Sequence, residues 1–135
     1  MSGESRSDSA DSFCHDPHMP PTVLIVDDHP TFRRFARRLL EEFGFSVVGE
    51  APDGAAAIEA TRRLRPETVL LDVLLPDVSG LVVAAELARE QSPPVVVLTS
   101  SRSASDLGAA LREAPARGFI PKASLTGPAF AELVT

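Results

Sequence analysis

The chain has 135 residues, of which 44% are apolar and 24% charged, with a formal net charge of −6. This length fits one domain, and the composition is that of a globular protein, which excludes wholesale disorder. The excess of acidic residues argues against nucleic-acid binding through phosphates, and no apolar run approaches the roughly 18 residues of a membrane helix. The single cysteine excludes an internal disulfide and fits a reducing compartment, so we expect a cytoplasmic protein.

Residues 1–20 differ in composition from the rest of the chain. They contain five serines, four acidic residues and one arginine, without apolar periodicity. Such a segment cannot bury enough apolar surface to offset its ordering entropy, which predicts a disordered tail over 1–20 and one domain over 21–135. Cys14, His15 and His18 are metal-ligand types, but their place in this tail argues against a built metal site.

From residue 22 onward, short runs rich in β-branched residues alternate with helical patterns. The expected strands are 22–28, 45–50, 68–74, 94–100 and 118–122, and the expected helices are 31–43, 54–65, 80–90, 104–114 and 126–134. Several of the strand runs are continuously apolar, which is typical of parallel strands covered on both faces. Five β–α repeats predict an α/β fold with a doubly wound parallel sheet.

Residues of the expected types mark the ends of these helices. Pro30 and Asp53 suit helix starts, whereas Gly44 and Pro66 suit helix ends, and Pro115 should end the fourth helix early. The first helix has an apolar stripe, formed by Phe32, Phe35, Leu39, Leu40 and Phe43. Its other side carries four arginines, two of which are spaced to pair with Glu41 and Glu42.

Polar residues follow the apolar strand runs at their carboxyl ends. Asp27 and Asp28 end the first run, Asp72 lies in the third, Thr99 ends the fourth and Lys122 ends the fifth. Ligands bind beyond these ends in open parallel sheets, so the side chains should share one cleft. Three carboxylates together need a cation, for which Mg²⁺ is suited, and Lys122 adds a compact charge for a phosphoryl oxygen. Carboxylates can form aspartyl phosphates, and the central Asp72 is the natural acceptor.

These motifs resemble those of receiver domains of bacterial two-component response regulators. The resemblance rests on Val-Leu-Ile-Val-Asp-Asp-His-Pro at 23–30, Leu-Asp-Val-Leu-Leu-Pro-Asp-Val-Ser-Gly at 71–80, Leu-Thr-Ser at 98–100 and Gly-Phe-Ile-Pro-Lys at 118–122. It implies a flavodoxin-like sheet of order 2-1-3-4-5 with helices on both faces. It also implies that Asp72 accepts a phosphoryl group from the phosphohistidine of a sensor histidine kinase.

The same resemblance assigns roles to further residues. It implies that Mg²⁺ is held by Asp27, Asp28, Asp72 and the backbone carbonyl of Leu74. Lys122, Thr99 and Phe119 would bind the phosphoryl group or switch in response to it. The first helix would dock the kinase through Arg33, Arg34 and Arg37. A homodimer through the fourth helix, fifth strand and fifth helix is a further expectation, whereas the downstream partner is unknown.

Three other functions are alternatives to this one. A degenerate receiver would act as an interaction module without phosphorylation. The chain could also be the receiver of a longer DNA-binding regulator, a branch of the family that Val-Gly-Glu-Ala at 48–51 resembles. An autonomous phosphohydrolase would need a second general acid–base residue and a substrate pocket, and the sequence offers neither, so we expect no separate enzyme activity.

Overall fold

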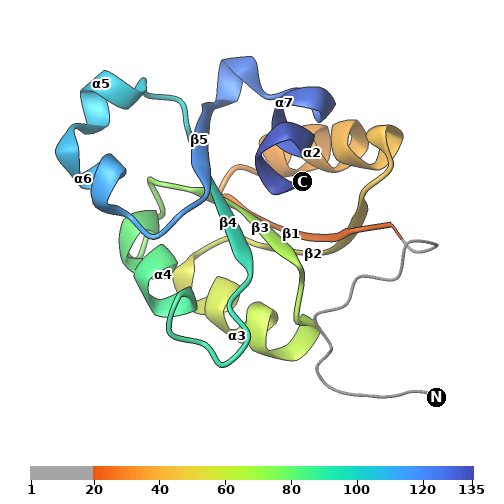
Figure 1. Ribbon diagram of the computed structural model, residues 1–135, viewed down its shortest axis with the longest axis horizontal. Helices are drawn as coiled ribbons and strands as arrows, with labels where there is room; N and C mark the ends of the chain where they lie inside the picture. The colour runs from red at the N-terminus through yellow and green to blue at the C-terminus, as the bar shows by residue number, and fades with distance from the viewer. Residues whose placement is uncertain (1–19) are drawn as a thin grey trace.

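The computed structural model describes residues 20–135, except for the side chain of Ala104. The tail predicted over 1–20 therefore lies almost wholly outside the described residues. Five strands form one sheet: β1 (Thr22–Val26), β2 (Ser46–Ala51), β3 (Thr68–Asp72), β4 (Val95–Ser100) and β5 (Gly118–Pro121). All neighbouring strands are parallel, in the order β2-β1-β3-β4-β5 (Figure 1). The predicted fold class and strand order are confirmed.

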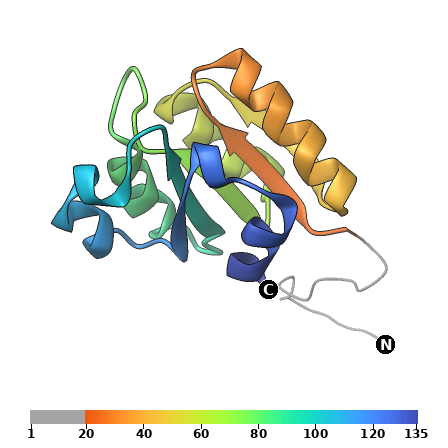
Figure 2. The same ribbon diagram turned by 90° about the horizontal axis from the view of Figure 1, so that it is seen from above.

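The helices divide between the two faces of the sheet. α2 (Pro30–Phe43) and α7 (Gly127–Val134) cover one face, whereas α3 (Gly54–Leu64) and α4 (Gly80–Leu87) cover the other (Figure 1). The short helices α5 (Ala104–Leu107) and α6 (Ala109–Glu113) lie at the end of the molecule opposite α2 (Figure 2). A 3-10 turn, η2 (Lys122–Ser124), follows β5 directly.

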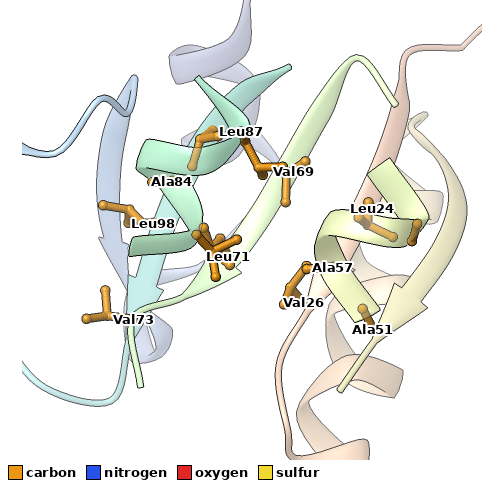
Figure 3. Packing of buried hydrophobic residues seen from close by; sticks show 13 residues of the cluster. Leu24, Val26, Ala51, Ala57, Val69, Leu71, Val73, Ala84, Leu87 and Leu98 are labelled. Carbon is orange, nitrogen blue, oxygen red and sulfur yellow. The ribbon is translucent and has the colours of Figure 1, made fainter. Parts of the chain in front are cut away.

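Alternate residues of each strand supply two separate cores, because successive side chains of a strand point to opposite faces. Val23, Ile25, Leu70 and Val97 pack under α2 and α7, where the fully buried ring of Phe130 also lies. The other core lies under α3 and α4 (Figure 3) and includes Leu24, Val26, Val69, Leu71 and Leu98. With both faces covered, β1, β3 and β4 are nearly free of exposed side chains, which explains their continuously apolar sequences.

The predicted helix boundaries are largely confirmed. Pro30 occupies the first turn of α2, and that helix ends at Gly44, whose φ is 115°. The Asp53 side chain accepts a hydrogen bond from the backbone N–H of Ala56 and caps α3. Arg65, in the left-handed region before Pro66, ends the same helix.

One expectation about the helices is wrong. The fourth predicted helix, 104–114, is divided into α5 and α6 at Gly108, whose φ of 72° does not fit a continuous helix. The apolar stripe of α2 is only partly buried, since Phe35 is 50% and Phe43 48% exposed. Leu40, another member of the stripe, is fully buried together with Ala36.

Candidate functional site

The predicted site residues meet at the carboxyl ends of the central strands. Asp27 and Asp28 directly follow β1, Asp72 is the last residue of β3, and Lys122 directly follows β5. Asp27 and Asp72 are buried, whereas the Asp28 side chain is partly exposed at the rim. The sequence-based grouping of these four residues is therefore reproduced in the fold.

Lys122 connects two of the carboxylates. Its Nζ lies 2.6 Å from Asp27 Oδ2 and 3.3 Å from Asp72 Oδ2. The ammonium also lies over the ring of Phe32 in α2, 4.5 Å from the ring centroid. An ammonium is attracted to the electron-rich face of an aromatic ring, so Phe32 helps to hold Lys122 between the carboxylates. From the sequence, Phe32 is predicted only as part of the apolar stripe of this helix.

The backbone around Asp72 is fixed by two local contacts. Asp72 Oδ1 accepts a 3.1 Å hydrogen bond from the backbone N–H of Leu74. The start of α4 packs directly against this segment, since a Cβ at Gly80 would overlap the backbone carbonyl of Asp72. On the same loop, Asp77 accepts hydrogen bonds from the N–H groups of Gly54 and Ala55, which ties the loop to the start of α3.

The carboxylates differ in their ionisation. Burial, with the neighbouring charge of Asp27, raises the pKa of Asp72 to about 6 from its ordinary 3.8. Burial also opposes ionisation of Asp27, but the contact with the Lys122 ammonium and the hydrogen bond from the His29 backbone outweigh it and lower its pKa. For Lys122, burial opposes the charged form, yet contacts with both carboxylates raise its pKa above the usual value. One ammonium thus serves two buried carboxylates, and Asp72 is left with the weaker stabilisation.

The donor set fits a hard divalent cation. Asp27 Oδ2 and Asp28 Oδ1 are buried atoms without a hydrogen bond in the described part of the chain, although Lys122 and His29 respectively contact them as ion-pair partners. Ligand atoms of Asp27, Asp28, His29 and Asp72 all lie within 4.8 Å of one another. Carboxylate oxygens with free lone pairs are what Mg²⁺ prefers, and such an ion would offset the excess negative charge.

The two predicted switch residues lie beside this cluster. Thr99 is paired with Asp72 in the β3–β4 register, and it is fully buried. Its hydroxyl donates a 2.7 Å hydrogen bond to the backbone carbonyl of Ile120 in β5. Phe119 is half-buried and packs against the core under α3 and α4. Thr99 thus lies beside Asp72, whereas Phe119 is paired with Leu98 in the β4–β5 register, and neither contacts the Asp72 carboxylate among the interactions of the described chain.

The three predicted docking arginines of α2 differ in their surroundings. Arg33 donates to Glu50 of β2 and to the backbone carbonyl of Asp27, and Arg37 binds the other carboxylate oxygen of Glu50. Burial opposes ionisation of Glu50, but both arginines outweigh it and hold its pKa below the usual range. Arg34 is exposed and has no ion pair to another described residue. Of the three, Arg34 is the one free to contact a partner.

Comparisons with known proteins agree with this geometry. A family model described as the response regulator receiver domain matches residues 23–128. The nitrate/nitrite response regulator protein NarP of Escherichia coli (strain K12) is 43% identical over 107 residues, which cover 78% of this chain and 49% of NarP. The transcriptional regulatory protein PdtaR of Mycobacterium tuberculosis is 36% identical over 107 residues, covering 79% of this chain and 52% of PdtaR.

A solved structure shows the same architecture. The signal receiver domain of the putative response regulator NarL from Mycobacterium tuberculosis superimposes with a TM-score of 0.79 at 32% identity, covering 86% of this chain and 97% of that one. The chain spans about half the length, or less, of the curated relatives that it matches. No helix in the described range 20–135 is long and apolar enough to cross a membrane. From the family match, the fold and the placement of the acidic cluster, the chain belongs to the response regulator receiver domain family of two-component signalling.

Proposed function

We propose that this receiver domain is a phosphoacceptor in which Asp72 takes a phosphoryl group from the phosphohistidine of a sensor histidine kinase. The observation that carries the proposal is the convergence of Asp27, Asp28, Asp72 and Lys122 on one cluster at the ends of β1, β3 and β5. In the transfer, a carboxylate oxygen of Asp72 forms a bond to phosphorus while the bond from phosphorus to the donor imidazole nitrogen breaks. The imidazole leaves as a neutral group after taking a proton from solvent.

The chain's own residues prepare that step in distinct ways. The Leu74 N–H orients the Asp72 carboxylate, and the ammonium of Lys122 lies where it can neutralise an added phosphoryl oxygen. Asp27, Asp28, Asp72 and the Leu74 carbonyl would hold Mg²⁺, and that ion supplies charge neutralisation for the phosphoryl oxygens. We therefore propose a switch that is itself modified by a phosphoryl group, and not an enzyme that converts a separate substrate.

Thr99 and Phe119 are proposed to report the modification. The Thr99 hydroxyl would exchange its bond to the Ile120 carbonyl for one to the phosphoryl group, and β5 carries Phe119 beside that carbonyl. A changed β5 surface could then be recognised by a downstream protein, a second copy of the chain or an attached output domain. For the kinase, we propose docking on α2 with Arg34 as the exposed contact. A cytoplasmic location is part of the same proposal.

Intact-mass spectrometry tests the phosphoacceptor directly. The full chain is incubated with a small phosphodonor and Mg²⁺, and in parallel with a phosphorylated histidine-kinase domain. We expect one added phosphoryl group in wild type, none with a chelator and none in Asp72→Ala. Asp77→Asn is the matched control, because it removes an exposed carboxylate from the same loop. Failure of both donors to modify wild type would refute the proposal and favour a phosphorylation-independent interaction module.

A further inference from the structure

His29 lies in direct contact with the acidic cluster, although nothing in the proposed function requires it. Its Nδ1 is 3.0 Å from Asp27 Oδ1 and 3.1 Å from Asp28 Oδ1. Its side chain is 66% exposed, so burial does not force the ring into this position. The imidazole nitrogen therefore faces the two carboxylates while the other edge of the ring is open to water.

The spacing of these three atoms matches that of neighbouring ligands around one ion. In an octahedral site with bonds of about 2.1 Å, adjacent ligand atoms lie about 3.0 Å apart. His29 Nδ1 has this separation from Asp27 Oδ1, with which it shares a hydrogen bond in the metal-free cluster, and from Asp28 Oδ1. The His29 backbone N–H also donates a 2.8 Å hydrogen bond to Asp27 Oδ1, which fixes the loop in this arrangement.

The charges at this position also favour a bound cation. Asp27 Oδ2 is paired with the ammonium of Lys122 at 2.6 Å and the buried Asp28 Oδ1 with His29 Nδ1 at 3.1 Å, and neither oxygen accepts a further hydrogen bond from the described residues. A single ammonium thus faces the carboxylates of Asp27 and Asp72, with that of Asp28 beside them, which leaves lone pairs and an excess of negative charge for a cation. The loop after β1 therefore offers two carboxylates with free lone pairs and one imidazole nitrogen on the same side.

We propose that His29 Nδ1 is a third protein ligand beside Asp27 and Asp28, so that this loop binds a divalent transition-metal ion more tightly than Mg²⁺. Mg²⁺ prefers oxygen ligands, whereas Co²⁺ and Zn²⁺ bind imidazole nitrogen readily. A carboxylate pair with one imidazole thus favours the latter ions. The inference rests on the proposed cation site and adds its metal preference: a transition-metal ion occupies the same carboxylates and competes with Mg²⁺.

The test compares metal affinities in a chain whose only histidine is His29. The sequence contains three histidines and one cysteine, so Cys14→Ser, His15→Gln and His18→Gln are present in every sample, without an affinity tag. Calorimetric titrations with Mg²⁺ and Co²⁺ are run on this background, on His29→Gln and on Asp28→Asn. A ¹⁵N spectrum of the His29 imidazole is recorded with and without Zn²⁺, which is diamagnetic.

We expect Co²⁺ to bind the background chain at least about tenfold more tightly than Mg²⁺. His29→Gln should lose at least about tenfold in Co²⁺ affinity while Mg²⁺ affinity changes by less than about threefold, since loss of a direct ligand should cost at least what loss of a supporting residue costs. Zn²⁺ should shift the Nδ1 resonance. Unchanged Co²⁺ affinity in His29→Gln, or an unchanged Nδ1 resonance at saturating Zn²⁺, would overturn the proposal.

Asp28→Asn separates this inference from the proposed function. In one outcome, Asp28→Asn weakens Mg²⁺ binding, whereas His29→Gln changes neither Mg²⁺ nor Co²⁺ affinity. That result supports the Mg²⁺ site and rejects His29 as a ligand. Absence of Mg²⁺ binding with His29-dependent Co²⁺ binding supports the ligand assignment and removes the Mg²⁺ site. Absence of binding by either ion rejects both.

Discussion

Replacing Asp72 with asparagine should stabilise the metal-free protein. Asp72 and Asp27 share a single ammonium, that of Lys122, which lies closer to Asp27. The amide keeps an oxygen to accept the Leu74 N–H, and its NH₂ can donate to Asp27 as a protonated Asp72 would. The substitution therefore leaves a balanced Asp27–Lys122 pair and removes the less stabilised buried charge.

The size of the effect follows from the raised pKa. A pKa of about 6, against 3.8 in an ordinary carboxyl, corresponds to about 3 kcal/mol of differential stability at neutral pH. The lowered pKa of the coupled Asp27 offsets part of this, so we expect a net gain of about 1–2 kcal/mol. For a domain of this size, that gain raises the melting temperature by about 3–8 °C.

The pH dependence has a defined sign. Because the pKa of Asp72 is raised in the folded state, that state binds the proton more tightly than the unfolded chain does. The protonated Asp72 therefore stabilises the folded wild type fully below about pH 4, and this stabilisation is lost as the pH rises through about 6. The advantage of Asp72→Asn should be present at pH 7.5 and vanish as the pH approaches about 4.

Differential scanning calorimetry in a chelator, with wild type and Asp72→Asn at several pH values, measures this difference. Asp77→Asn is the control of opposite sign, because the hydrogen bonds from Gly54 and Ala55 lower the pKa of that exposed carboxyl. Its melting temperature should fall at neutral pH. An unchanged or lowered melting temperature for Asp72→Asn at pH 7.5 would show that Asp72 is not the destabilised member of the cluster.

Other substitutions test the packing around the site. Gly80→Ala should destabilise the fold by at least about 3 kcal/mol, because its Cβ would meet backbone atoms. Gly108→Ala has open space around it and should cost only about 1 kcal/mol, because of its positive φ. Urea denaturation compares the two variants, and equal losses of stability would contradict the close contact at the start of α4. Phe32→Leu should lower stability by about 1–2 kcal/mol and slow phosphorylation by the small donor, because the ammonium of Lys122 loses the ring beneath it. An unchanged phosphorylation rate in quench-flow assays would show that Phe32 does not contribute to phosphoryl transfer. Glu50→Gln should lower stability by less than about 1 kcal/mol at pH 7. Because the pKa of Glu50 is lowered in the folded protein, this stability difference should disappear in acid as the wild-type carboxylate becomes protonated. Melting curves at pH 7 and pH 3 test the prediction.

The sheet and its acidic edge were predictable because they depend on short sequence signals. Continuous apolar runs identified the buried strands, and the polar residue ending each run identified the site, since parallel strands present their carboxyl ends together. These signals need no knowledge of side-chain conformation. They were enough for the parallel sheet and for the convergence of Asp27, Asp72 and Lys122, whereas the strand order came from the resemblance to receiver domains.

The remaining features depend on contacts between distant elements. Glu50 joins Arg33 and Arg37 only because β2 passes beside α2, and no spacing in the sequence relates these residues. Phe32 reaches Lys122 across 90 positions of the chain, so its role beneath the ammonium had no local signal. The break at Gly108 was missed because the surrounding alanines favour a helix, whereas the backbone adopts a positive φ there.

The hydrogen bond from Thr99 to the Ile120 carbonyl has a consequence for background signalling. Turning the hydroxyl away breaks this buried hydrogen bond, at a cost of about 1–3 kcal/mol when the groups find no other partner. A cost of this size keeps the turned conformer at about 1–15% of molecules in the absence of a phosphoryl group that could accept the hydrogen bond. If Thr99 is the switch we propose, the unmodified protein gives a low but finite output. Substituting Thr99 with valine would then remove both the bond that holds the resting state and the group proposed to report the signal.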